Sequence, residues 1–244
     1  MRVDICVPIY NEEKVIAQNA QRILDYCEDS LSYCDWRVVL VINGTTDGSA
    51  KLACELEKIH ERLLYVEYQD SGKGQALHRY WHESSADILV GMDSDLAVSL
   101  HALTPLIKPL INNQADLSIG SRYLPDSKVH RSLMREIISR VFNYLAHILL
   151  HNPQKDLQCG FKALTKSTFT LLEHRATNKD WFFDTELISW ANLLNLRIIE
   201  IPVDWREGRF DRRRSTVHFL KIIQDFILPM LTLRKIMKRY KSSL

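Results

Sequence analysis

Two periodicities of apolar residues alternate along the first half of the chain. Short, almost continuously apolar runs occupy residues 3–10, 38–43, 63–68, 87–92 and 116–121. Runs of this kind are typical of strands that are buried on both faces of a parallel sheet. Between them, apolar residues recur at helical spacing over residues 12–27, 47–60, 73–85 and 101–113. The alternation predicts an α/β fold, with a mostly parallel sheet flanked by helices.

The second half of the chain has a different order of elements. The pattern predicts helices at residues 131–150, 166–174 and 184–195 and strands at residues 157–165 and 197–204. No linker or internal repeat interrupts this order, so residues 1–215 are interpreted as one domain. Residues 216–244 form an amphipathic tail in which Pro229 would interrupt a helix. This tail either belongs to the same domain or docks on a membrane.

Charge is unevenly distributed, although the formal net charge of the 244 residues is only +2. Residues 205–244 contain 11 Lys/Arg and 3 Asp/Glu, so the C-terminal end is basic and the remainder is mildly acidic. The overall balance does not indicate a nucleic-acid partner. A basic amphipathic tail instead favours an anionic surface or ligand.

The five cysteines are scattered and include no CxxC pair. This is typical of reduced thiols inside a cell. Arg2 and Asp4 interrupt the N-terminal apolar stretch, so it does not resemble a signal peptide, and no segment has the ~18 consecutive apolar residues of a membrane span. The expected location is cytoplasmic, peripheral on the cytoplasmic face of a membrane.

Polar and glycine-rich segments follow each of the five predicted strands. They read PIYNEE (8–13), NGTTDGS (43–49), DSGKG (70–74), DSD (93–95) and GSR (120–122). Ligands of open α/β sheets bind beyond the carboxyl ends of the strands, where the strand order reverses. The sequence therefore predicts one site formed by these five segments.

The DSD segment places two carboxylates directly after an apolar strand. In an extended chain, residues two apart point the same way, so Asp93 and Asp95 can address one cation. Mg²⁺ typically takes one or two carboxylates together with phosphate oxygens, and Mn²⁺ would serve equally. The alternative interpretation is structural, with Asp95 capping a turn and Asp93 solvated at the strand end.

Taken together, VPIYNE, NGTTDGS, GKGQALHR, DSD, GSR, DLQCGFKAL and WFFDTEL resemble family 2 glycosyltransferases with the Rossmann-like GT-A fold. The resemblance runs from about Val7 to Ser215. It is greatest to the members that load a sugar onto a polyprenyl phosphate, and the CGFK stretch is more similar to the glucosyl than to the mannosyl enzymes. It implies an inverting, metal-dependent transfer from a nucleotide sugar.

The resemblance also implies residue roles on the donor side. The donor-binding set is Pro8, Tyr10, Glu12, Asn43, Asp47, Lys73, Asp93, Ser94, Asp95 and Arg214, with Asp93 and Asp95 as metal ligands. The chain departs from the family pattern after the second strand, where Ile42 and Asn43 stand in place of two acids. An amide donates and accepts hydrogen bonds, whereas a carboxylate only accepts. UDP-glucose is the favoured donor type, with GDP-mannose second.

On the acceptor side, the resemblance implies that Arg122, Arg135, Ser139, Arg140 and Gln158 bind a lipid phosphate. Arginine suits this task because its planar fork binds phosphate oxygens bidentately. The apolar residues of 141–150 would enter a membrane interface. The alternative is a core helix with a charged outer face.

Asp93, Asp95, Arg122 and Asp184 are the candidate catalytic residues. Asp184 would act as a base only if the acceptor were a glycan or protein hydroxyl, because a lipid phosphate is already anionic. That soluble-acceptor enzyme is one rival function. The other is a nucleotidyltransferase or a catalytically silent nucleotide-sugar binder, since one fold hosts several activities.

Overall fold

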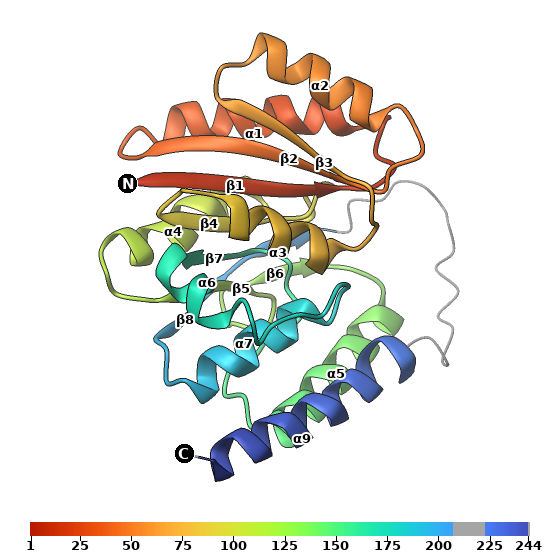
Figure 1. Ribbon diagram of the computed structural model, residues 1–244, viewed down its shortest axis with the longest axis vertical. Helices are drawn as coiled ribbons and strands as arrows, with labels where there is room; N and C mark the ends of the chain where they lie inside the picture. Colours follow the sequence, from red (N-terminus) through yellow and green to blue (C-terminus); the bar gives the residue numbers. More distant parts are fainter. Residues whose placement is uncertain (207–222, 244) are drawn as a thin grey trace.

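A seven-stranded sheet with the order β3-β2-β1-β4-β7-β5-β8 forms the centre of the protein (Figure 1). The computed structural model describes residues 1–206 and 223–243. The strands of this sheet are β1 (Arg2–Ile9), β2 (Asp35–Asn43), β3 (Leu63–Tyr68), β4 (Ile88–Gly91), β5 (Leu117–Ser121), β7 (Lys162–Thr165) and β8 (Ile198–Pro202). A second, two-stranded parallel sheet pairs β6 (Lys128–His130) with β9 (Asp204–Arg206).

Helices cover both faces of the main sheet. They are α1 (Ile16–Ser30), α2 (Ser49–Ile59), α3 (Lys73–Glu83), α4 (Leu103–Ile111), α5 (Leu133–Leu150), α6 (Lys166–Leu172), α7 (Phe183–Leu193) and α9 (Leu228–Ser242). Alternate strand residues point to opposite faces. One face packs on α1, α2 and α4, and the other on α3, α6 and α7. The predicted α/β class with a mostly parallel sheet is confirmed.

The strand order reverses between β1 and β4. Strands β2 and β3 lie on one side of β1, and the chain then returns through α3 to place β4 on the other side, parallel to β1. The carboxyl ends of these strands therefore lie at one edge of the sheet, as the sequence predicted.

Strand β7 is antiparallel to both neighbours, β4 and β5, which the pattern of apolar runs did not predict. The predicted strand at 157–165 was also too long, because only Lys162–Thr165 joins the sheet. Residues just before it bond to side chains instead: the Leu157 N–H donates to Asn143 Oδ1 at 2.9 Å and the Gln158 N–H to Asp156 Oδ1 at 3.2 Å. The antiparallel direction places the first residue of β7, Lys162, opposite Gly91 at the carboxyl end of β4.

The C-terminal helix docks on the domain. Met230, Leu233 and Met237 of α9 are buried in the same core as α3, α6 and α7. Helix α9 lies beside α5 (Figure 1). The ring of Trp190 in α7 contacts that of Tyr240 in α9, with centroids 5.5 Å apart. Pro229 lies in the first turn of α9, directly after a π-helical segment, η2 (Ile223–Ile227). The predicted interruption at Pro229 therefore coincides with the start of the helix, where proline is tolerated.

Candidate active site

Lys73 and Asp93 meet where β4 ends. Asp93 follows β4, and Lys73 is the first residue of α3; Lys73 Nζ lies 2.6 Å from Asp93 Oδ1. The Lys73 side chain is 10% exposed and that of Asp93 is 33% exposed. Burial raises the pKa of Asp93, but the charge of Lys73 outweighs it and holds the pKa below its ordinary value. The Asp93 carboxylate is therefore ionised and has a resident cationic partner.

The glycines on either side of Lys73 fix its position. A Cβ atom at Gly72 would lie 2.6 Å from the carbonyl oxygen of Lys179, and one at Gly74 would lie 2.5 Å from that of Asn178. Gly72 also has φ +139°, which other residues rarely adopt. The GKG motif is therefore required by close packing of the 178–180 segment on the start of α3, which aims Lys73 at Asp93.

Asp184 and Lys162 extend this ion pair into the core. Lys162 is fully buried, and its Nζ pairs with Asp184 Oδ1 and donates to the Cys159 carbonyl at 3.0 Å. Asp184 Oδ2 lies 3.5 Å from Lys73 Nζ. Burial lowers the pKa of Lys162, although the charge of Asp184 opposes the shift. Asp93, Lys73, Asp184 and Lys162 therefore form a row of alternating charges, named here the charge row.

Gly160 lies directly against the exposed end of the charge row. A Cβ atom there would lie 2.4 Å from Asp93 Oδ2 and 2.4 Å from Lys73 Nζ. No side chain fits this position without moving one of the two charges. The glycine of the CGFK motif therefore leaves the ion pair undisturbed, whereas a larger residue would displace the ends of the Asp93 and Lys73 side chains.

Arg122, predicted as an acceptor-binding and catalytic residue, is held by Asp156. Arg122 Nε lies 2.6 Å from Asp156 Oδ2, and Nη2 lies 2.8 Å from Oδ1. The Asp156 side chain is fully buried, and burial raises its pKa while the charge of Arg122 lowers it to a value below the ordinary one. The motif that contains Asp156 was noted in the sequence, but no role was assigned to this residue.

A second cluster surrounds the ring of Tyr123. The guanidinium carbons of Arg122, Arg131 and Arg140 lie 5.9, 5.6 and 5.2 Å from its centroid. The Tyr123 hydroxyl accepts from Arg131 Nη2 and donates to Ser139 Oγ, both at 2.8 Å. These residues are named here the arginine cluster. Sequence reasoning missed Arg131, whose side chain is 4% exposed, because its partner Tyr123 lies in a separate loop.

Glu136 occupies the arginine cluster as its anion. Its carboxylate is ion-paired with both Arg131 and Arg140. Burial raises the pKa of Glu136, and hydrogen bonds from the two arginines hold it below its ordinary value. Ser139 Oγ completes the cluster with a 3.5 Å contact to Gln158 Oε1. Arg135 is also part of α5.

One segment, residues 156–162, joins the charge row to the arginine cluster. Every second residue makes a different contact: Asp156 binds Arg122, Gln158 contacts Ser139, Gly160 faces Asp93, and Lys162 binds Asp184. The chain bends at Leu157 and Gly160, so these contacts come from an irregular segment that passes both clusters before β7 begins at Lys162. The two clusters are therefore parts of one site.

The residues predicted to bind the donor lie around the loops after β1, β2 and β4. Ser94 Oγ donates to Glu12 Oε1 at 3.3 Å, and Tyr10 is 53% exposed. Pro8 is part of β1, opposite Val41 of β2. Arg214 lies outside the described residues.

Two of the donor-side residues bond to the protein itself. Asn43 is buried and donates to the Ile9 carbonyl at 3.0 Å, while its Oδ1 accepts from the Gly72 N–H at 3.4 Å. Asp47 Oδ1 accepts from the N–H of Ser49, the first residue of α2, at 3.0 Å and from the Ser49 hydroxyl at 2.6 Å, which orders the turn before that helix. Both side chains thereby order the loops of the rim.

The donor atoms at the rim fit a divalent cation that arrives with a phosphate. The Asp93 and Asp95 carboxylates offer hard oxygen atoms of the kind that Mg²⁺ prefers. Asp95 Oδ1 also accepts from the Ala97 N–H at 3.1 Å, as expected for a residue that caps a turn. Within residues 1–206 and 223–243, no group of three or more acidic, histidine or cysteine side chains is arranged to hold a metal. Mg²⁺ bound through one or two carboxylates and phosphate oxygens matches this set.

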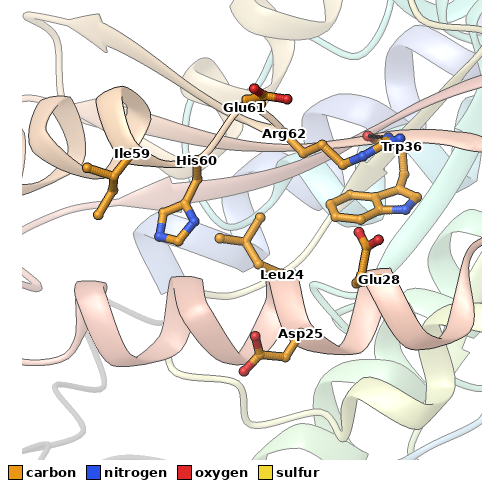
Figure 2. A pocket seen from close by; sticks show the side chains of 8 residues that line it. All are labelled: Leu24, Asp25, Glu28, Trp36, Ile59, His60, Glu61 and Arg62. Atoms are coloured by element: carbon orange, nitrogen blue, oxygen red, sulfur yellow. Dashed lines mark hydrogen bonds between the residues drawn. The ribbon is translucent and has the colours of Figure 1, made fainter.

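A pocket of about 420 Å³ lies at the opposite edge of the sheet (Figure 2). It is formed by the end of α1, the start of β2 and the loop before β3, and Arg62 stacks 4.8 Å above the Trp36 ring. Because these are the amino ends of the strands, the pocket is separate from the charge row. Ligands of open α/β sheets bind at the other edge.

The fold and the site define an α/β enzyme domain of the GT-A type, with acidic residues and basic clusters at the carboxyl edge of its sheet. Residues 4–171 match the family described as glycosyl transferase family 2. The chain belongs to this family, and it is a glycosyltransferase, as the sequence predicted.

Several known proteins are similar to this chain. AglD, a glycosyltransferase of Haloferax volcanii, is 31% identical over 206 residues, which are 84% of this chain and 33% of AglD. ALG5D of Trichomonas vaginalis, a dolichyl-phosphate beta-glucosyltransferase, is 31% identical over 216 residues, which are 84% of this chain and 66% of ALG5D. The chain thus spans about a third of one relative and about two thirds of the other.

Solved structures confirm the GT-A-like architecture. Glucosyl-3-phosphoglycerate synthase from Mycobacterium tuberculosis, in complex with UDP, superposes with a TM-score of 0.70 at 20% identity, over 96% of this chain and 80% of that one. The mannosyltransferase PcManGT from Pyrobaculum calidifontis, in complex with GDP-Man and Mn²⁺, superposes with a TM-score of 0.57 at 19% identity, over 97% of this chain and 69% of that one. At these identities the likeness shows the fold alone.

Proposed function

We propose that the protein transfers a hexose from a nucleotide sugar to a polyprenyl phosphate, with inversion at the anomeric carbon. UDP-glucose is the favoured donor type, ahead of GDP-mannose. Relatives that are dolichyl-phosphate beta-glucosyltransferases, 24–31% identical to this chain, support this choice. The observation that carries it is that residues 156–162 join a charge row to an arginine cluster.

In this proposal the two clusters have separate tasks. Asp93 and Asp95 would hold Mg²⁺ or Mn²⁺, and the cation would supply charge stabilisation to the leaving group. Arg131 and Arg140 hold the acceptor phosphate, and Asp156 fixes Arg122 beside them. An acceptor phosphate oxygen forms the new bond to the anomeric carbon. The bond from that carbon to the diphosphate breaks, and its electron pair leaves with the nucleoside diphosphate.

No protein base is required for this reaction, because the attacking phosphate oxygen is already anionic. Asp184 is 2% exposed and paired with Lys162, so it serves better as an anchor for the two lysines than as a base. This geometry favours the phosphate acceptor over the hydroxyl acceptor, for which Asp184 would be the base.

An exposed apolar surface on α5 supports a lipid acceptor. Apolar side chains repeat along the exposed side of this helix: Leu133, Met134, Ile137, Val141, Tyr144 and Ile148. In α9, Leu228, Leu231 and Ile236 are exposed as well, beside the basic residues of that helix. Apolar and basic groups together suit the interface of an anionic membrane. Among the described helices, none is both long and apolar enough to cross a bilayer.

A transfer assay tests the proposal. The purified protein is incubated with Mn²⁺, a short-chain polyprenyl phosphate and either radiolabelled UDP-glucose or radiolabelled GDP-mannose. The expected result is label that extracts into organic solvent from the UDP-glucose reaction. Label released only to a glycan or to water would contradict the lipid acceptor, and pyrophosphate release from a nucleoside triphosphate would indicate a nucleotidyltransferase.

A further inference from the structure

The Lys73 ammonium is paired with the Asp93 carboxylate, which a divalent cation would need as a ligand. Its Nζ lies 2.6 Å from Asp93 Oδ1, which is ion-pair contact, and Gly160 leaves room for no side chain beside them. A cation on Asp93 and the Lys73 ammonium would repel each other at this separation. Binding a cation to Asp93 therefore requires Lys73 to move or to gain another anionic partner.

The surroundings of Lys73 hold its ammonium in place on the buried side, and only its contact with Asp93 is open to solvent. Asp184 Oδ2 lies 3.5 Å from the ammonium, and the ring of Trp181 lies 4.9 Å from it. Asp184 is itself fixed by the buried Lys162. Asp93, in contrast, is the one partner in the row with a substantially exposed side chain, at 33%. The Lys73–Asp93 contact is therefore the contact in the row that a ligand from solvent can replace.

The described part of the chain offers a free cation few ligands. It contains no group of three or more suitable side chains, and of the two rim carboxylates Asp93 is already neutralised by Lys73. A nucleoside diphosphate would change both conditions at once. Its phosphate oxygens add ligands for the cation, and its negative charge gives the Lys73 ammonium an alternative partner.

We propose that Lys73 is a resident counter-ion of Asp93 that makes divalent-cation binding depend on the nucleoside diphosphate. Without nucleotide, the ammonium neutralises Asp93 and free cations bind weakly. When the diphosphate arrives, Lys73 transfers its contact from Asp93 to a phosphate oxygen, and Asp93 becomes available to the cation. Cation and nucleotide thus bind cooperatively, and each raises the affinity of the other by the same factor. The inference rests on the proposed function, because it concerns the same site.

The experiment measures the Kd of Mn²⁺ by electron paramagnetic resonance, with and without saturating UDP, and again with GDP. In Lys73→Met, the Kd of Mn²⁺ without nucleotide is expected to fall about tenfold, within the usual range of coupling factors. The gain in Mn²⁺ affinity on adding nucleotide is expected to shrink by a similar factor. Lys58→Met, which removes an exposed lysine at the far end of α2, is the matched control and should leave both values unchanged.

Two further variants separate the proposal from simpler explanations. Lys73→Gln removes the charge but keeps a hydrogen-bond donor, and the same changes in Mn²⁺ binding are expected for it. It therefore replaces Lys73→Met in the experiment if Lys73→Met does not fold. Lys73→Arg keeps the charge and should retain weak binding of free Mn²⁺. If Lys73 only repelled Mn²⁺ at long range, its removal would strengthen Mn²⁺ binding equally with and without nucleotide. The gain in Mn²⁺ affinity on adding nucleotide would then be the same in the variants as in the wild type, and that result would overturn the proposal.

The outcome is also independent of the transfer assay. If the wild-type protein transfers sugar but the neutral variants bind free Mn²⁺ no better than it does, only the counter-ion role fails. If the variants show the expected coupling loss while no lipid acceptor is glycosylated, the counter-ion role stands and the proposed acceptor fails. Wild-type protein that binds no Mn²⁺ even with nucleotide would also overturn the inference.

Discussion

Arg122 and Asp156 form a two-point ion pair, with Nε 2.6 Å from Oδ2 and Nη2 2.8 Å from Oδ1, across 34 residues of sequence. Asp156 Oδ2 also accepts the backbone N–H of Arg122 at 3.0 Å. Arg122 belongs to the arginine cluster, and both side chains are largely buried, so neither can lose its partner without leaving a charge in a dry environment. This pair links the end of β5 to the segment that precedes β7.

Asp156→Asn is expected to destabilise the protein by about 3–5 kcal/mol, because it leaves the Arg122 guanidinium buried without a counter-charge. Urea unfolding at pH 7 gives the free energy of unfolding. Asp126→Asn, at an exposed position in the neighbouring loop, is the matched control and should change it by less than about 0.5 kcal/mol. Equal stability of the two variants would show that the pair contributes nothing.

The same pair predicts a dependence of stability on pH. The pKa of Asp156 is below its ordinary value, so the pair contributes stability above the unfolded pKa of about 3.9 and loses it as pH falls through the folded pKa. The stability difference between wild type and Asp156→Asn should therefore be constant at neutral pH and shrink below about pH 4. A difference that does not shrink as the pH falls below about 4 would contradict this assignment.

Lys162 and Asp184 are expected to be energetically coupled. Breaking a buried pair costs about 3–5 kcal/mol, whereas removing both charges costs much less. In a double-mutant cycle, Lys162→Met and Asp184→Asn should each lower the free energy of unfolding. The loss in the double variant should be smaller than the sum of the two single losses by at least about 1 kcal/mol. Additive effects in urea unfolding would mean that the ion pair is energetically irrelevant.

Transfer activity is expected to require a divalent cation at the rim. EDTA should abolish transfer and added Mn²⁺ should restore it, while Asp95→Ala should lower kcat/KM by roughly a hundredfold or more, as expected for removal of one group that stabilises the transition state. Asp25→Ala, beside the pocket in Figure 2, is the control and should retain activity. Full activity in EDTA would rule out the metal-dependent mechanism.

Glu136 is expected to compete with the acceptor phosphate for Arg131 and Arg140. Glu136→Gln removes that internal anion, so the KM for a polyprenyl phosphate should fall about threefold to tenfold with little change in kcat, the range of a weak charge-pair competition. Glu61→Gln, at the opposite edge of the sheet, is the control. A raised KM would instead indicate that Glu136 orients the arginines for the acceptor.

The exposed face of α5 is expected to bind membranes. Tyr144→Glu and Ile148→Glu each place a charge on this face and should reduce co-sedimentation with vesicles of phosphatidylcholine and phosphatidylserine several-fold. Leu171→Glu, at an exposed apolar position in α6, is the matched control and should have no effect. Equal binding by all three variants would exclude α5 as the contact surface.

The order of strands and helices could be predicted from the sequence because it depends on local patterns. Continuous apolar runs mark strands buried on both faces, and the first five predicted runs each became a strand. The convergence of Asp93, Lys73 and Arg122 at one edge could also be predicted, since parallel strands direct their carboxyl ends to the same side. The sequence therefore predicted that these side chains lie close together, but it did not predict the partners that each of them contacts.

Those partners were decided by tertiary structure. Strand β7 inserts antiparallel between β4 and β5, which no local pattern specifies, and this brings Lys162 to Asp184 and Gly160 to Asp93. Arg122 pairs with Asp156, and Arg131 donates to the Tyr123 hydroxyl. Buried charges and hydroxyls need hydrogen-bond partners, and packing decides which partner is within reach. The sequence by itself determined which elements form and which edge carries the chemistry, because periodicity is local. Only the folded sheet decided which charge neutralises which, because those contacts join residues far apart in the chain.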